Sequence, residues 1–184
     1  MKGHRFLIPL FLLPLAFLAE AQRLVTKNGE ISFTSNAQLE VISASSNKVQ
    51  GIINAATSEF AFKVEIRSFN GFNSELQRQH FYENYMETEK FPSATFSGKI
   101  IEQVDFSQDG TVEVRAKGDL DIHGEKQTRI IKCKVTIKNN TATLDSHFLV
   151  PLIDHNIKIP KIVNQKIATE IEVAFKATMT IQAQ

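Results

Sequence analysis

Alternating apolar and polar residues dominate the second half of the chain. In "IIKCKVTIK" the apolar positions are Ile131, Cys133, Val135 and Ile137, and the intervening residues are three lysines and a threonine. A period of two is typical of a strand with one face in water. The same pattern recurs in four other runs, "EFAFKVEIRSF", "TVEVRAKGDLDIHG", "TATLDSHFLV" and "EIEVAFKATMTIQ", and a further strand is expected to begin at Thr95.

Turn signals separate these runs. They are Asn70-Gly71, Asp109-Gly110, His123-Gly124 and Asn139-Asn140, and the last of them lies between two alternating runs, as in a hairpin. Many antiparallel strands with one polar face predict an all-β sandwich or closed barrel. A closed barrel of about eight strands has a solid interior or holds a ligand, and the pattern alone does not decide between these.

One segment, "NSELQRQHFYENYMETEKF", breaks the alternation and predicts an amphipathic α-helix near residues 74–88. Ser74 and Gln77 match a capping box, and Phe91-Pro92 ends the helix. Its apolar stripe consists of Leu76, Phe81, Tyr82, Tyr85 and Met86. A single helix of this kind is expected to close or border an opening of the barrel.

The amino terminus predicts export. Residues 1–21 combine a basic start, an apolar run from Phe6 to Leu18 and the small-residue pattern Ala19-Glu20-Ala21, as in a signal peptide cleaved after Ala21. The alternative, a membrane anchor, requires about 20 apolar residues, and this run is shorter and contains two prolines. We therefore expect a periplasmic or secreted protein without stable membrane insertion, with residues 22–184 forming one domain.

Composition narrows the possible functions. The formal charge of +1 and scattered basic residues do not support nucleic-acid binding. Cys133 is the only cysteine, so no intramolecular disulfide forms, and its place in an apolar row predicts a buried, inert thiol. The chain has 14 Phe and no Trp, which suits either a hydrocarbon ligand or a plain Phe-rich core.

Two segments together resemble the YceI-like family of secreted polyisoprenoid-binding proteins. They are the helix ending in "EKFPSATFSGKI" and the following "AKGDLDIHGEKQTRIIKCKVTI", and "NIKIPKIVNQKIATEIEVAF" closes the chain in the family's order. The resemblance implies an eight-stranded, lipocalin-like antiparallel barrel whose apolar tunnel holds an isoprenoid or a related amphiphile, with no catalytic residue, metal or other cofactor. One departure is Glu125-Lys126-Gln127-Thr128, where the family often has Val-Thr-Lys-Pro.

Candidate site residues follow from the inward phase of each run and from the helix. The predicted tunnel wall comprises Phe60, Phe62, Phe81, Tyr85, Phe96, Phe148 and Phe175. The candidates for contact with a headgroup, on the helix and its approach, are Arg67, Arg78, His80 and Asn84, with His80 expected near the apolar edge of the helix. An apolar mouth also makes a homodimer one expectation.

Two other functions remain open at this stage. One is an enzyme that acts on a lipid inside the same barrel, and the other is a solid-core structural or interaction domain. No nucleophile elbow or phosphate loop occurs. Histidines and aspartates that could be drawn as a metal cluster (His123, His147, His155, Asp145 and Asp154) fit a solvated face better than a converging zinc site.

Overall fold

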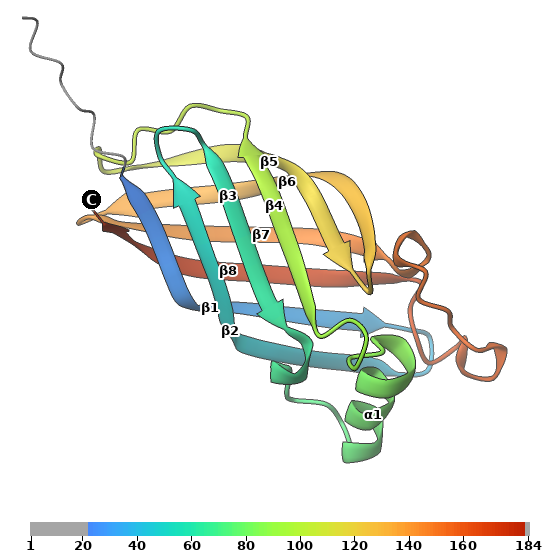
Figure 1. The fold of residues 1–184 in the computed structure, drawn as a ribbon. Helices are drawn as coiled ribbons and strands as arrows, with labels where there is room; N and C mark the ends of the chain where they lie inside the picture. The colour runs from blue at the N-terminus through green and yellow to red at the C-terminus, as the bar shows by residue number, and fades with distance from the viewer. Residues whose placement is uncertain (1–21, 183–184) are drawn as a thin grey trace, which may run out of the picture.

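The computed structural model describes residues 22–182, which form one closed barrel of eight antiparallel strands (Figure 1). Each strand pairs with its neighbours in chain order, and β8 pairs with β1. This confirms the predicted fold class, whereas the predicted signal peptide lies outside the described residues. The strands are β1 (Arg23–Asn36), β2 (Val41–Asn54), β3 (Glu59–Glu65), β4 (Ser93–Ile100), β5 (Gly110–Ile122), β6 (Glu125–Lys138), β7 (Thr141–Pro151) and β8 (Glu170–Gln182).

The hairpin turns lie where the sequence predicts them. Asn139 and Asn140 join β6 to β7 with φ angles of 49° and 61°, as in the type I′ turn that suits the twist of a hairpin. His123 and Gly124 join β5 to β6 with φ angles of 54° and 75°. The long β5–β6 ladder therefore stays in register from Gly110 opposite Ile137 to Ile122 opposite Glu125.

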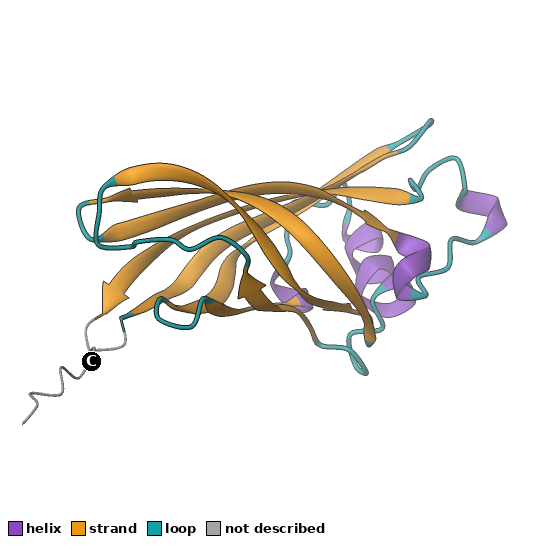
Figure 2. Ribbon diagram, turned by 90° about the horizontal axis from the view of Figure 1, so that it is seen from above, coloured by secondary structure: helices purple, strands orange, loops and turns teal. Residues whose placement is uncertain are grey.

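The helical segment is shorter than predicted. An α-helix, α1 (Glu75–His80), continues into a π-helical turn, η2 (Phe81–Tyr85), at one end of the barrel (Figures 1 and 2). The Ser74 hydroxyl accepts a hydrogen bond from the Gln77 amide, 3.1 Å away, and the Gln77 side chain accepts one from the Asn73 amide. The predicted cap is thus confirmed, with Asn73 in place of Ser74 as the second partner.

The buried face of the helical segment also differs from the predicted one. Leu76 was expected on the buried stripe but is 60% exposed. Met86 is buried, and Phe81, Tyr82 and Tyr85 are half-buried. Leu76 lies in the first turn of α1, which does not pack on the barrel through this side chain. The apolar residues of the stripe that pack on the barrel are therefore those of η2 and Met86, the residue after it. Three short 3₁₀ helices complete the fold: η1 (Ile66–Ser68), η3 (Leu152–His155) and η4 (Lys161–Val163).

Two seams open the barrel at its helix end. The β6–β7 ladder stops at Lys134 opposite Asp145, and the β2–β3 ladder stops at Gln50 opposite Lys63. The β1–β2 and β7–β8 ladders, by contrast, continue toward this end. The wall therefore divides there into two layers, β7-β8-β1-β2 and β3-β4-β5-β6. Two layers that have separated leave more room between their inner faces than a fully paired small barrel does.

Hydrogen bonds outside the ladders bridge both seams. At the first, the Arg129 guanidinium on β6 donates hydrogen bonds to the Leu149 carbonyl and to the Asp154 carboxylate. At the second, Ser45 and Asn70 exchange two backbone hydrogen bonds of 2.8 Å, which tie η1 and its following loop to β2. These bonds replace ladder bonds that the separated strands cannot make.

The two ends of the barrel differ in packing. The end away from the helix is solid: Leu24, Met179 and Ile181 are buried there, and Phe106 of the β4–β5 loop, 4% exposed, packs on the same cluster. A second buried cluster, which includes Val64, Phe69 and Met86, lies at the helix end. Other members of the first cluster, such as Ile53 and Phe60, also line a cavity, so the solid packing closes only the extreme end of the interior.

Candidate functional site: an apolar cavity at the helix end

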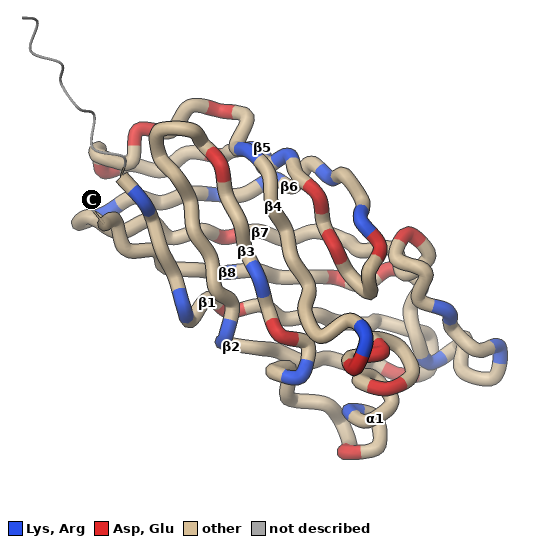
Figure 3. Tube along the Cα trace, in the orientation of Figure 1, with Lys and Arg blue, Asp and Glu red and all other residues tan. Residues whose placement is uncertain are grey.

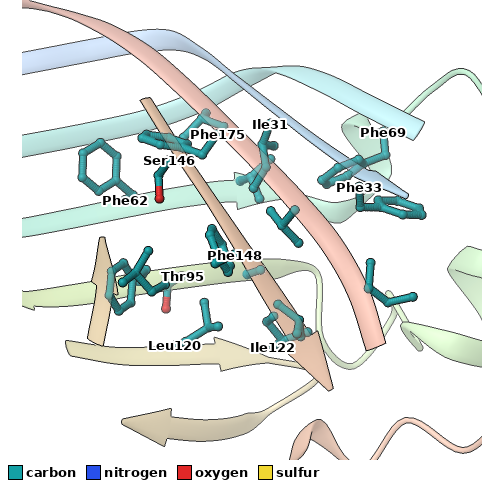
Figure 4. Close-up of a pocket in the computed structure, with 18 of the residues that line it drawn as sticks. Ile31, Phe33, Phe62, Phe69, Thr95, Leu120, Ile122, Ser146, Phe148 and Phe175 are labelled. Atoms are coloured by element: carbon teal, nitrogen blue, oxygen red, sulfur yellow. The ribbon is translucent and has the colours of Figure 1, made fainter. Parts of the chain in front are cut away.

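A cavity of about 270 Å³ lies inside the barrel, with a wall drawn from all eight strands and from the helical segment (Figure 4). Its size is just below the range of about 300–1,000 Å³ that is typical of small-molecule sites. Within residues 22–182, no carboxylate or imidazole lines it. The wall is almost entirely hydrocarbon, so the cavity suits an apolar group.

All seven residues predicted for the tunnel wall lie on the wall of this cavity. Four of them form a chain of rings: Phe60 lies 4.9 Å from Phe96 and 6.1 Å from Phe62, and Phe62 meets Phe175 edge-on at 5.2 Å. Tilted and edge-on contacts at these distances are favourable for aromatic pairs. Whether the seven residues contact a ligand stays a prediction.

A second aromatic group lies beneath the helical segment. Phe81 stacks on Phe33 of β1 with centroids 5.2 Å apart and contacts Phe72 at 5.1 Å, and Phe69 lies 5.6 Å from Phe33. Phe33, Phe69 and Phe72 also line the cavity, and the sequence analysis missed them. Tyr82 does not line the cavity, and its hydroxyl donates a hydrogen bond to the backbone carbonyl of Phe69 at 2.8 Å.

Few polar groups reach the wall. Ser146 donates to the Lys132 carbonyl and Ser35 accepts from the Ala168 amide, so both hydroxyls are used by the protein. The Gln77 amide group donates to the Glu40 carboxylate. Burial raises the pKa of the Tyr85 hydroxyl, which therefore stays protonated as a hydrogen-bond donor at neutral pH. Tyr85 and Gln77 are the polar groups nearest the helix end that a bound molecule could meet.

The predicted headgroup residues do not line the cavity. Arg67 pairs with Glu89, and Arg78 pairs with Glu75 on the same helix. His80 and Asn84 are exposed, so His80 is not at the apolar edge as expected. In the helical segment Phe81 and Tyr85 face the cavity, so Arg78, His80 and Asn84 lie on its other sides, and Arg67 lies outside this segment in η1.

Cys133 lies on the cavity wall, and its burial raises the pKa of its thiol to about 11. A thiol with so high a pKa is a poor nucleophile, which agrees with the predicted inert cysteine. The other groups considered for chemistry are dispersed. His147 lies 3.5 Å from Asp145 on the outer surface, and no group of three or more metal-ligating residues occurs within residues 22–182.

His123 and His155 have structural contacts. One ring nitrogen of His123 lies 2.9 Å from the Glu87 carboxylate and the other lies 3.1 Å from the His155 carbonyl. The His155 ring, fully buried, contacts the Glu125 carbonyl through Nδ1. These bonds tie the segment after η2 to the β5–β6 turn and to η3. The segment Glu125–Thr128, which lacks the family's usual proline, therefore packs on η3.

Three segments meet at the helix end: α1 and the loop 152–169 between β7 and β8 contribute to the cavity wall, and the β1–β2 turn is hydrogen-bonded to both. The Leu39 amide in the turn donates to the Gln165 carbonyl in the loop at 2.9 Å, and the Asn73 side chain before α1 donates to the Val41 carbonyl at 3.0 Å. Ile157 and Ile167 of the loop lie on the cavity wall. Access to the cavity therefore depends on these segments.

The chain matches a known family model, the YceI-like domain, over residues 23–179. The chain belongs to the YceI-like family. No curated protein matches the chain. Within the residues that the structure describes, no helix is long and apolar enough to cross a membrane.

Solved structures share the fold of this YceI-like chain at low sequence identity. A polyisoprenoid binding domain from Saccharophagus degradans, implicated in plant cell wall breakdown, has a TM-score of 0.71 and 16% identity, covering 90% of this chain and 99% of the domain. BcnA of Burkholderia cenocepacia has a TM-score of 0.67 and 16% identity, with coverage of 83% and 96%. The YCEI protein of Campylobacter jejuni has a TM-score of 0.55 and 11% identity, with full coverage of both chains. At these identities the likeness shows the fold alone.

Proposed function

We propose that this protein is a periplasmic or secreted carrier that holds an isoprenoid or a similar amphiphilic lipid in the cavity. The observation that carries the proposal is the wall itself, which is built from apolar side chains of every strand and closed at one end by solid core. Membership of the YceI-like family and the polyisoprenoid binding domain among its structural relatives support the same ligand class.

The energetics favour a chain-like apolar ligand. Burying one CH₂ group contributes about 0.8 kcal/mol, so a ten-carbon chain contributes about 8 kcal/mol before association losses. Those losses are about 4 kcal/mol or more, which leaves about 4 kcal/mol at best, or millimolar binding, for ten carbons and tighter binding for a longer chain. Polar groups are needed only at one end, and Tyr85 and Gln77 lie on the wall at the helix end.

The wall argues against catalysis and against a fully solid core. The titratable side chains that line the cavity within residues 22–182 are Lys63, Tyr85 and Cys133, and Lys63 is half exposed and paired with Glu65. None of these forms an acid–base pair with another, as turnover of a lipid requires. The solid-core alternative describes only the end around Leu24 and Met179, because other members of the same buried cluster line the cavity.

The direct test is mass spectrometry of an organic extract of protein purified from its native host. We expect one lipid class at close to one molecule per chain. Phe148→Asp places a charge on the cavity wall and should yield folded protein without lipid, whereas Ile130→Asp, at a position 57% exposed on the outer face, should keep it. Wild-type protein without extractable lipid, together with a Phe148→Asp variant that fails to fold, would refute the carrier function.

Export is tested separately. Amino-terminal sequencing of the same native protein should begin at or within a few residues of Gln22, as the signal-peptide pattern predicts. Recovery of soluble protein that begins at Met1 would remove the extracytoplasmic part of the proposal and leave the lipid cavity untouched.

A further inference from the structure

The loop 152–169 contains isoleucines in two different environments. Ile157 and Ile167 lie on the cavity wall, whereas Ile162, midway between them in η4, is 91% exposed. The loop projects beyond the end of the barrel in both views (Figures 1 and 2). Leu39, 63% exposed, lies on the adjacent turn, whose amide is bonded to Gln165 of the loop. The segments that meet at this end of the barrel thus also present apolar side chains to solvent.

The same loop is basic. Lys158, Lys161 and Lys166 are exposed, and no aspartate or glutamate occurs between residues 155 and 169. None of the three lysines forms an ion pair with a residue in the described part of the chain. The whole chain has a formal charge of only +1, so these lysines are a local concentration of charge, visible as blue segments on the loop in Figure 3.

An apolar tip among unpaired lysines has the chemistry of a membrane-surface contact. We infer that the loop 152–169 docks the protein on a bilayer that carries anionic headgroups, with Ile162 inserted at the boundary between headgroups and acyl chains. Lysine stems extend along apolar surface while their ammonium groups reach the phosphates, and anionic lipids attract such clusters. This inference goes beyond the proposed function, because it concerns where the protein binds and not what the cavity holds.

A bilayer fits the tip better than a second protein chain. A stable protein interface buries about 1,200 Å² or more with complementary shape, whereas the exposed apolar groups here are three separate side chains, Ile153, Ile162 and Leu39, each next to a charged residue in the sequence. Two copies joined through this loop would also bring like charges together. Docking at the loop would place the cavity's border, through Ile157 and Ile167, next to the acyl chains.

The test is co-sedimentation of the chain from Gln22 onward with vesicles of phosphatidylcholine containing about 30% phosphatidylglycerol, compared with pure phosphatidylcholine. We expect binding to the anionic vesicles only, and its loss at high salt. Since each lysine near an anionic surface contributes about a five-fold factor, the combined variant Lys158→Gln, Lys161→Gln and Lys166→Gln should bind about 100-fold more weakly. Ile162→Ser should weaken binding about five-fold or more.

Matched controls lie on the barrel wall. The variant Lys132→Gln, Lys134→Gln and Lys138→Gln removes the same charge from exposed positions of β6, and Ile130→Ser removes an exposed isoleucine from the same strand. Both should bind the anionic vesicles within about two-fold of wild type, since both lie outside the loop.

Three outcomes would overturn the docking inference: no binding to anionic vesicles, equal losses in the loop and β6 lysine variants, or a concentration-dependent dimer that Ile162→Ser abolishes while vesicles are ignored. Lipid extracted from each variant separates this result from the proposed function. If the loop variants lose vesicle binding but keep the wild-type level of extracted lipid, docking is supported as a property separate from lipid binding. Failure of wild type to bind vesicles while it retains lipid overturns docking alone.

Discussion

Replacing Phe81 with alanine tests how the helical segment seals the cavity. The Phe81 ring contacts four other rings at centroid distances between 5.1 and 6.1 Å, those of Phe33, Phe69, Phe72 and Tyr82. A fully buried Phe→Ala change costs about 3–5 kcal/mol. Phe81 is half-buried and already borders a cavity, so roughly half of that cost is expected, about 2 kcal/mol in the free energy of unfolding.

The measurement is urea unfolding of lipid-free protein, with thermal unfolding as a second readout. For a chain of this size about 2 kcal/mol corresponds to a fall in Tm of about 4–8 °C. Leu76→Ala on the same helix is the matched control. Leu76 is 60% exposed, so its loss should change the unfolding free energy by no more than about 0.5 kcal/mol.

Ligand retention gives the second half of the test. Phe81→Ala enlarges the helix end of the cavity, so lipid should leave faster from this variant than from wild type or Leu76→Ala. Equal stability of the two alanine variants would refute the packing of η2 on β1. A loss of about 4 kcal/mol with unchanged lipid release would instead mean that Phe81 belongs to a solid core.

Three further experiments test other parts of the structure: two substitutions and one labelling measurement. Arg129→Met removes the two hydrogen bonds of this side chain, to the Leu149 carbonyl and the Asp154 carboxylate, and should lower the unfolding free energy by about 1–2 kcal/mol. Amide hydrogen exchange should become faster at the β6–β7 seam and change little elsewhere, and uniform protection across β6 and β7 would contradict this prediction. Ser74→Ala should cost about 1 kcal/mol by urea unfolding, and no change would mean that the capped turn is already frayed. With a thiol pKa of about 11, about one Cys133 side chain in a thousand is a thiolate at pH 8. A disulfide reagent should therefore modify Cys133 more than 100-fold more slowly than free cysteine, and the rate of modification should rise as the pH approaches 11. Fast labelling at pH 8 would refute the burial of this thiol.

The sequence predicts those strands whose inner rows are mostly apolar. β5 and β6 alternate without interruption, and their hairpin has the predicted turn. β1 and β2 were missed because their inner rows contain polar or small residues, among them Thr26, Ser35 and Ser46, which are 3–4% exposed. The hydroxyls of Ser35 and Ser46 bond to other segments, which is compatible with their burial, but polar residues in an inner row erase the apolar period that identifies a strand.

The aromatic wall was predicted in part for the same reason. Phe60, Phe96 and Phe175 lie in clear alternating runs, and the structure places each of them on the cavity. Phe33 lies in the serine-rich β1, and Phe72 follows the Asn70-Gly71 turn, where no periodicity exists to place a side chain. The headgroup candidates could not be placed either, because the sequence does not show that only Gln77, Phe81 and Tyr85 of the helical segment reach the cavity.

The position of the cavity follows from strand pairing, which no single strand reveals. In a fully paired small barrel, inward side chains fill the interior, as they do around Leu24 and Met179. Where the β2–β3 and β6–β7 ladders end, the two layers separate, and phenylalanines from both layers cover the widened space without filling it. Arg129 and the Ser45–Asn70 bridge hold the layers at that separation. The ends of these two ladders thus create the space for the cavity. The loops that complete this end of the barrel then control access to it.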